Sequence, residues 1–276
     1  WSLLSRCIPL SFLWRNNMTL KSKLLLAALA TSSAAFAQTA PAAAESAIAY
    51  NVGVVSEYRY RGLAQTKGDP ALQGGIDYTD ASGFYIGTWA STIKWIKEDA
   101  AAASTPYSAK GPVEIDIYGG YKGEASGVAY DVGYLRYQYQ GNTLAKATFF
   151  DNANTDEIYG AATVGVFTAK YSYSLSNLFG TLNSKGSTYT DLSATFDLGN
   201  GYSLVPHVGR QLVKNSTTAT STGNYTDVAL TLNKDLGDGL SASLAALSTN
   251  ANKGAYTQNG YYQGKNIVVA GLKYSF

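Results

Sequence analysis

Several residue types are scarce in this chain of 276 residues. It contains one cysteine, one methionine and one histidine, and only 14% of its residues are charged, whereas soluble domains average about a quarter. No apolar run reaches the ~20 residues that a membrane-spanning helix needs. The low charge content and the absence of helical spans together indicate strands that are apolar on one face. The 22 tyrosines agree, because amphipathic rings favour membrane interfaces.

The amino-terminal region has the pattern of a leader. Met18 is the expected start of the native protein, which makes residues 1–17 a non-native or upstream extension. Residues 18–37 are expected to be a secretory signal peptide, because Lys21 and Lys23 precede a short apolar stretch and small residues. The alternative is an N-terminal membrane anchor, which the shortness of the apolar stretch disfavours.

Cleavage after Ala37 changes the chemistry of the chain. The leader carries four basic residues and no acidic one, so the net charge falls from +2 to −2 and gives no case for nucleic acid. Removal of Cys7 excludes a disulfide framework, a thiolate metal site, a cysteine nucleophile and a lipoprotein. With no calcium-type acidic spacing, no metal and no cofactor are expected. Residues 38–46 are expected to be a flexible lead-in to one domain, residues 47–276.

Segments of alternating polarity recur through this domain. In Val113–Tyr121, Phe167–Leu175 and Tyr225–Asp235, apolar residues on one face oppose polar residues on the other, as in half-buried strands. Val128–Tyr139 changes phase, and a bulge near Tyr134 would reconcile its two halves. The segment 83–95 is apolar on both faces, so its sequence does not show which face points to the lumen.

The first segment, Ala47–Arg61, also alternates. Tyr58 and Tyr60 fall on its apolar face, which is expected to meet lipid. Its polar residues fall on the opposite face, and this places Arg59 and Arg61 at the outer end of the first strand, before an external loop.

The connections between the segments alternate between short and long. Tight turns rich in Gly, Asp and Asn are expected at 80–83, 122–127, 199–201 and 237–239. Long connections are expected at 62–70, 96–112, 141–155, 177–187, 214–224 and 250–264. Such sorting is typical of outer-membrane barrels, which have short periplasmic turns and long external loops. The sequence therefore predicts an all-β fold, a transmembrane antiparallel up-and-down β-barrel of about twelve strands. The turn near 164–166 is the weakest, which leaves ten or fourteen strands open.

The last strand has an apolar face that ends in two aromatic rings. Leu272, Tyr274 and Phe276 alternate with Gly271 and Lys273. This ending resembles the C-terminal signal of outer-membrane proteins, which implies recognition by the barrel-assembly machinery.

One part of the sequence resembles a family. The elements are Ser-x-Tyr-x-x-Arg-Gly at Ser56–Gly62 and Gly-x-Trp-x-Ser at Gly87–Ser91. This run, in the first third of the chain, resembles the TorF family of proteobacterial outer-membrane porins. The resemblance implies a barrel in the bacterial outer membrane, in contact with its lipid, and a pore, but no particular substrate.

Charged residues on the faces opposite the apolar ones are the candidate pore-lining residues, because a charge facing lipid costs several kcal/mol near the midplane. They are Glu57, Arg59, Arg61, Asp77, Glu114, Asp116, Asp131, Lys170, Asp191, Asp227 and Lys273. Two interpretations stay open: salt bridges that plug the barrel, or a polar lumen whose charges select solutes. Apart from Arg59 and Arg61, most of these candidate residues are acidic, which favours a weak preference of the pore for cations.

The expected function is a porin-like channel for passive diffusion of small hydrophilic solutes or ions. The alternatives are a non-conducting barrel that acts in structure or surface recognition, and a barrel enzyme that uses His207 as a general base. The enzyme is disfavoured because no Gly-x-Ser-x-Gly element is present and His207 is expected to line the lumen as a structural residue. The oligomeric state and the solute cannot be read from the sequence.

Overall fold

The computed structural model describes residues 47–102, 109–147, 149–216 and 222–276, and the side chains of residues 99–102 are not described. The expected extension 1–17, signal peptide 18–37 and lead-in 38–46 lie outside these residues. Within them, neither helix is long and apolar enough to cross a membrane.

The described chain forms a closed antiparallel β-barrel, in which each wall strand pairs with the next and β17 pairs with β1. The wall strands are β1 (Ala47–Val55), β4 (Ala71–Thr79), β5 (Phe84–Thr92), β6 (Val113–Ala125), β7 (Val128–Tyr139), β8 (Thr155–Val164), β9 (Phe167–Ser174), β10 (Thr188–Ala194), β11 (Phe196–Gly199), β12 (Tyr202–Leu212), β13 (Tyr225–Gly237), β14 (Leu240–Thr249) and β17 (Ile267–Ser275). Because β10 and β11 both pair with β12 in one continuous register, they are two parts of one strand. The prediction of about twelve strands is confirmed.

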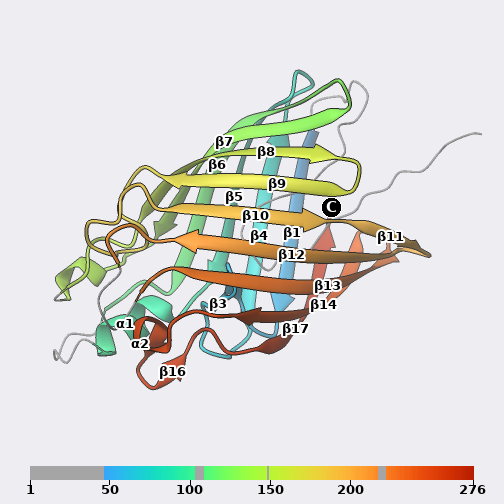
Figure 1. Ribbon diagram of the computed structural model, residues 1–276. Helices are drawn as coiled ribbons and strands as arrows, with labels where there is room; N and C mark the ends of the chain where they lie inside the picture. Colours follow the sequence, from blue (N-terminus) through green and yellow to red (C-terminus); the bar gives the residue numbers. More distant parts are fainter. Residues whose placement is uncertain (1–46, 103–108, 148, 217–221) are drawn as a thin grey trace, which may run out of the picture.

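The two ends of the barrel differ. At one end lie Phe276 and the tight turns, several of which have left-handed residues, as at Asp238 (φ 50°) and Gly239 (φ 81°). At the other end lie the long connections, and Figure 1 shows α1 and α2 there, on the left of the view. We call these the short-turn end and the long-loop end. The predicted alternation of short and long connections is confirmed along the whole barrel.

The long connections contain short elements of their own. These are β2 (Arg59–Tyr60), β3 (Leu63–Ala64), α1 (Trp95–Ala102), η1 (Leu144–Lys146), α2 (Lys253–Tyr256), β15 (Thr257–Gln258) and β16 (Tyr261–Tyr262).

The outer face of the barrel is apolar, as expected for strands that alternate between lipid and lumen. On β1, Val52 and Val54 are exposed, whereas Gly53 and Val55 between and beyond them are not. At the short-turn end, Phe276 stacks on Tyr274 and Tyr50 with ring centroids 5.4 and 5.5 Å apart. Because this stack lies on the outer face, it adds aromatic rings to the apolar surface at the short-turn end.

The bulge predicted near Tyr134 is wrong. The pairing of β6 with β7 runs without a shift from Glu114–Tyr139 to Ala125–Val128. The aromatic residues at the long-loop end of β7 therefore face the lumen, and Arg136 faces outward. The phase change arises because this end of the strand carries polar residues outward and aromatic residues inward.

Candidate functional site: the lumen and its inward loop

Large side chains on the lumen wall lie across glycines of neighbouring strands. A Cβ atom on Gly209 would lie 1.9 Å from the Tyr189 hydroxyl oxygen, and one on Gly87 would lie 2.5 Å from the Tyr118 ring. The same arrangement joins Tyr85 to Gly120 and Tyr159 to Gly133. The absence of a side chain at these positions lets the tyrosines lie flat against the wall, which fixes where their hydroxyl groups point.

The first long connection, residues 56–70, folds into the barrel at the long-loop end, and we call it the inward loop. Within it, β2 and β3 form a hairpin joined by the two-residue turn Arg61-Gly62, whose φ angles are 46° and 79°. The side chains of Tyr58 and Tyr60 are buried inside the barrel. The prediction that these two tyrosines meet lipid is wrong, because strand β1 ends at Val55 and the chain then turns inward.

Tyrosine hydroxyl groups attach the inward loop to β6 and β7. Tyr58 donates a hydrogen bond to Glu114 Oε1 at 2.7 Å. The hydroxyl groups of Tyr60 and Tyr137 lie 2.6 Å apart, and their rings pack edge to face. Buried tyrosines combine ring packing with a directed hydrogen bond, so both contacts stabilise the docked loop.

Arg61, at the tip of the hairpin, binds the opposite wall. Its guanidinium group donates to both carboxylate oxygens of Glu157 on β8, at 3.0 and 2.8 Å, and to Gln211 Oε1 on β12 at 3.0 Å. The Tyr189 ring lies 4.3 Å from Arg61 Cζ. Arg61 is 4% exposed and Glu157 2%, so this ion pair lies in a water-poor part of the lumen.

A second ion pair holds the base of the inward loop. Arg59 pairs with Glu57 at 2.7 Å and donates to the backbone oxygens of Gln263 and Lys265 in the last long connection. Tyr261 donates to Glu57 at 2.8 Å. Burial and this hydrogen bond raise the pKa of Tyr261 to about 12, so the hydroxyl remains a donor. The last long connection thus holds the base of the inward loop in place.

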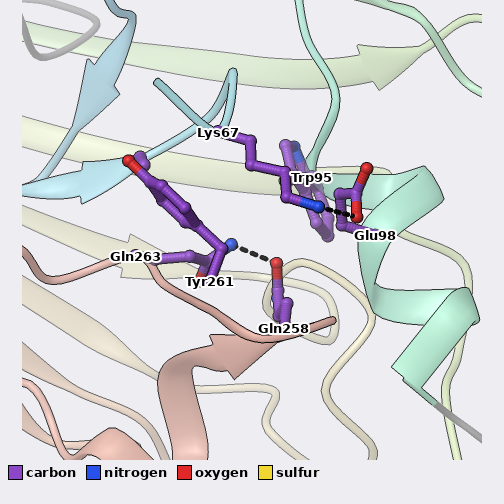
Figure 2. A pocket seen from close by; sticks show the side chains of 7 residues that line it. Lys67, Trp95, Glu98, Gln258, Tyr261 and Gln263 are labelled. Atoms are coloured by element: carbon purple, nitrogen blue, oxygen red, sulfur yellow. Dashed lines mark hydrogen bonds and ion pairs between the residues drawn. The ribbon is translucent and has the colours of Figure 1, made fainter. Parts of the chain in front are cut away.

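The packing above the inward loop leaves little space. A small pocket of ≈ 10 Å³ lies among Ala64, Lys67, Trp95, Glu98, Gln258, Tyr261 and Gln263. Figure 2 shows the Lys67–Glu98 ion pair on one side and Gln258 with Gln263 on the other. Since this is about the smallest cavity that can hold one water molecule, the loops close tightly at this point.

Deeper in the lumen, His207 lies between two carboxylates. Its Nδ1 atom is 3.0 Å from Asp191 Oδ2, and its Nε2 atom is 2.9 Å from Asp227 Oδ1. Tyr189 also donates to Asp227, at 3.0 Å. The side chains of His207 and Asp191 are 13% and 14% exposed, so this cluster meets water more than the Arg61 pair does. With both ring nitrogens engaged by carboxylates, His207 is placed to balance charge.

The half of the lumen toward the short-turn end is polar and half-buried. Asp77 accepts a hydrogen bond from Tyr118 at 2.5 Å, and Asp131 accepts one from Tyr85 at 2.6 Å. Lys170 lies over the Tyr159 ring, 3.9 Å from its centroid. These charges are separated by tyrosines. No group of three His, Cys, Asp or Glu residues in the described ranges has an arrangement that holds a metal ion.

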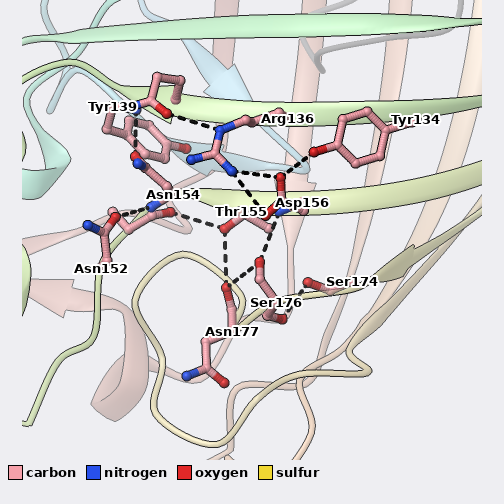
Figure 3. A network of polar contacts seen from close by, with 12 residues as sticks. Tyr134, Arg136, Tyr139, Asn152, Asn154, Thr155, Asp156, Ser174, Ser176 and Asn177 are labelled. Carbon is pink, nitrogen blue, oxygen red and sulfur yellow. Dashed lines mark hydrogen bonds and ion pairs between the residues drawn. The ribbon is translucent and has the colours of Figure 1, made fainter.

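The outer face at the long-loop end carries its own polar network. Arg136 Nη1 donates to both carboxylate oxygens of Asp156 on the neighbouring strand, at 2.9 and 3.1 Å, and Tyr134 donates to the same carboxylate. Figure 3 shows that the backbone N–H of Asp156 donates to Ser176 Oγ, which in turn donates to the backbone oxygen of Asn177 in the β9–β10 connection. This charged pair on the outer face marks where the apolar surface ends, toward the long-loop end.

The structure separates the candidate residues into two groups. Eight lie on the inward faces of wall strands: Asp77, Glu114, Asp116, Asp131, Lys170, Asp191, Asp227 and Lys273. Glu57, Arg59 and Arg61 do not lie on the wall, because they belong to the inward loop. The prediction that Arg59 and Arg61 lie at the outer end of the first strand is therefore wrong.

Sequence reasoning missed three residues of the site: Glu157, Tyr189 and Gln211. Glu157 carries a readable signal, because it alternates with the apolar Ile158 in the same way as the acids of other strands. Tyr189 and Gln211 carry no such signal, since the sequence around an uncharged side chain on an alternating strand does not identify a partner in a distant loop.

Comparison with known proteins places the chain in a family. The profile of the Gcw_chp family, described as bacterial proteins of unknown function, matches residues 39–276, and the chain belongs to this family. No curated protein matches.

Several solved structures of porins and channels are similar to the chain. A KdgM porin in complex with disordered oligogalacturonate is 8% identical, with a TM-score of 0.47 over 83% of this chain and 98% of the porin. The NanC porin is 10% identical, with a TM-score of 0.46 over 83% and 98%. An outer membrane channel from Pseudomonas putida F1 is 11% identical, with a TM-score of 0.45 over 86% and 99%.

Proposed function

We propose that this member of the Gcw_chp family is an outer-membrane channel for passive diffusion of small hydrophilic solutes or ions. The observation that carries the proposal is the contrast between the two faces of the wall: apolar side chains outside, and charged side chains such as Asp131, Lys170 and Asp191 inside. A closed barrel satisfies its backbone hydrogen bonds within the membrane, and a polar lumen gives solutes a path.

The inward loop makes this channel narrow. Twelve strands lie between barrels of ~8 strands, which side chains fill, and those of 16–18 strands, which hold aqueous channels. The buried Tyr58, Tyr60 and Arg61 then occupy the lumen at the long-loop end. We propose that small ions pass beside the loop and that larger solutes require it to leave the lumen.

We also propose that the pore prefers cations weakly. Both arginines of the inward loop are paired, Arg59 with Glu57 and Arg61 with Glu157. Acids therefore dominate the remaining wall, and Asp116 has one carboxylate oxygen without a hydrogen-bond partner among the described residues. Reversal potentials across a planar bilayer with a salt gradient test this. A clear preference for anions would contradict it.

The second candidate is a non-conducting barrel that acts in structure or in surface recognition through its long loops. The burial of residues 57–62 of the inward loop favours it, since Glu57 is 1% exposed and Arg59 is fully buried. Single-channel recording of refolded protein separates the two candidates: a stable ion current supports the channel, and a silent, folded barrel supports the alternative.

We propose that the short turns lie in the periplasm and the long loops outside the cell, as is typical of outer-membrane barrels. We also propose that the barrel contacts outer-membrane lipid. It is inserted by the barrel-assembly machinery through Leu272, Tyr274 and Phe276. Its more specific identity is a TorF porin. A folded barrel of this kind runs faster on gels unheated than boiled. An enzyme based on His207 is not proposed, because Asp191 and Asp227 engage both of its ring nitrogens.

A further inference from the structure

The surroundings of Arg61 come largely from the wall and not from its own loop. Glu157 lies on β8, Tyr189 on β10 and Gln211 on β12, at sequence separations of 96 residues or more from Arg61. The carboxylate receives two N–H groups, the amide oxygen receives one, and the ring covers the guanidinium plane. This combination recognises a guanidinium group by charge, by shape and by its flat face.

Wall contacts position each of these three side chains. Gln211 donates from Nε2 to the backbone oxygen of Thr188 at 3.0 Å, which leaves Oε1 free to accept from the lumen. The Tyr189 hydroxyl group donates to Asp227 on β13. Glu157 accepts a hydrogen bond from Tyr137 at 3.2 Å. All three contacts are made by wall residues, so the arrangement does not depend on the Arg61 side chain for its orientation. Of the residues that make them, Tyr137 also contacts the inward loop, through Tyr60.

The backbone at Arg61 is unfavourable for an arginine. Both residues of the Arg61-Gly62 turn have positive φ, as in a type I′ hairpin, where Asn-Gly is the preferred pair. A non-glycine residue in the left-handed region is strained and persists where other interactions hold it. The contacts of the side chain with the wall supply those interactions, which assigns a role to the arginine itself.

We infer that Glu157, Tyr189 and Gln211 form a guanidinium-binding site on the lumen wall, which Arg61 occupies when the inward loop is docked. Small organic cations that carry a guanidinium group compete with Arg61 for this site and so favour release of the loop. The inference rests on the proposed channel and names its solute class. An ammonium group fits less well, because it is a point charge without a flat fork of donors. Anions are repelled by Glu157.

The test uses the full-length protein refolded in detergent, with Arg61→Asn as the main variant. Asparagine suits the left-handed turn, so the hairpin is retained while the guanidinium group is lost. The probe is guanidinium chloride at millimolar concentration, far below the molar range in which it denatures proteins. We expect it to raise the thermal midpoint of Arg61→Asn by roughly 2–4 °C at saturation. Urea and potassium chloride at the same concentrations should not.

Two variants serve as controls. Arg210→Ala removes an exposed arginine from the outer face of β12, next to Gln211 in sequence, and should respond to guanidinium as the wild type does. Adding Glu157→Gln to Arg61→Asn removes the carboxylate charge, and the guanidinium-specific rise should disappear. Arg61→Gly, which also suits the turn, replaces Arg61→Asn if the latter does not fold.

Current recordings on the same variants separate this inference from the channel itself. Guanidinium should block the current through Arg61→Asn, and roughly tenfold less when Glu157→Gln is added. A thermal rise in a silent barrel would uphold the site and refute the channel. A conducting Arg61→Asn barrel with no guanidinium-specific rise or block would uphold the channel and overturn the site. An equal rise with and without Glu157 would also overturn it.

Discussion

Arg61 and Glu157 join the inward loop to the far wall of the barrel through two hydrogen bonds of 3.0 and 2.8 Å. Both side chains are almost fully buried, so neither finds water as a substitute partner. Removing one member of such a pair leaves an uncompensated charge and costs about 3–5 kcal/mol. The pair therefore couples the charge of one wall residue to the position of the whole loop.

Replacing Glu157 with Gln should release the inward loop. The glutamine keeps the shape of the side chain but leaves the Arg61 cation without a counter-charge, and undocking lets the cation reach water. We expect a larger single-channel conductance and a lower thermal midpoint than in the wild type. Asp156→Asn is the matched control, since its partner Arg136 lies on the outer face, and it should leave the conductance unchanged. A glutamine variant that conducts as the wild type does would show that the Arg61–Glu157 pair does not hold the inward loop in the lumen.

Gly62→Ala should have a similar effect for a steric reason. A Cβ atom at Gly62 would lie 2.6 Å from the Cβ atom of Asp227 on β13, and the φ angle is +79°. The control is Gly68→Ala in the same loop, where φ is +88° but the nearest atom, the Tyr261 hydroxyl oxygen, is 3.5 Å away. Both variants carry backbone strain, and only the first clashes with the wall. We expect an increase in conductance for Gly62→Ala alone, and equal conductance would show that the hairpin tip does not contact β13 tightly.

The sequence predicted most of the wall and little of the inward loop. Strands such as β9 and β13 alternate strictly, so their inward charges Lys170 and Asp227 could be named in advance. Residues 56–61 continue the alternation of β1, and nothing local marks the point after Val55 where the chain leaves the wall. The partner that draws Arg61 inward is 96 residues away, and local periodicity does not encode such a pairing.

The phase of β7 illustrates a second limit. The predicted bulge near Tyr134 would turn Arg136 and Gln138 toward the lumen, away from lipid. The strand reaches beyond the apolar surface, however, and there an outward Arg136 pairs with Asp156. Polarity predicts the face of a residue only where the strand is in lipid, and sequence alone does not show where that region ends.

Replacing His207 with Ala should increase the preference for cations. The histidine lies within 3.0 Å of both Asp191 and Asp227, and its loss leaves two lumen carboxylates without this neighbour. Reversal potentials should shift toward the cation equilibrium potential. Ser193→Ala, at the position paired with His207 across β10 and β12, removes no charge and should leave the potential unchanged. A shift toward anions would contradict the charge-balancing role.

Phe276→Ala should reduce assembly in cells severalfold. Phe276 is 65% exposed and stacks on Tyr274 and Tyr50, beside the closing pair of strands. Phe167→Ala is a matched control, because this phenylalanine is also 65% exposed but lies at the start of β9. The measurement is the amount of heat-modifiable barrel in outer-membrane fractions. Equal amounts of the two variants would show that the terminal aromatic residue has no special part in assembly.

We propose that the barrel is a channel whose lumen the inward loop narrows. Val55 and Ala71, which flank this loop, are paired residues of adjacent strands, so a short hairpin turn can replace residues 57–69 without disturbing the wall. The decisive measurement is the single-channel conductance of this deletion variant beside the wild type, with both shown to be folded by heat-modifiable mobility. We predict a small current for the wild type and a severalfold larger, steady current for the deletion variant. A folded deletion variant that conducts no more than the wild type would contradict the account.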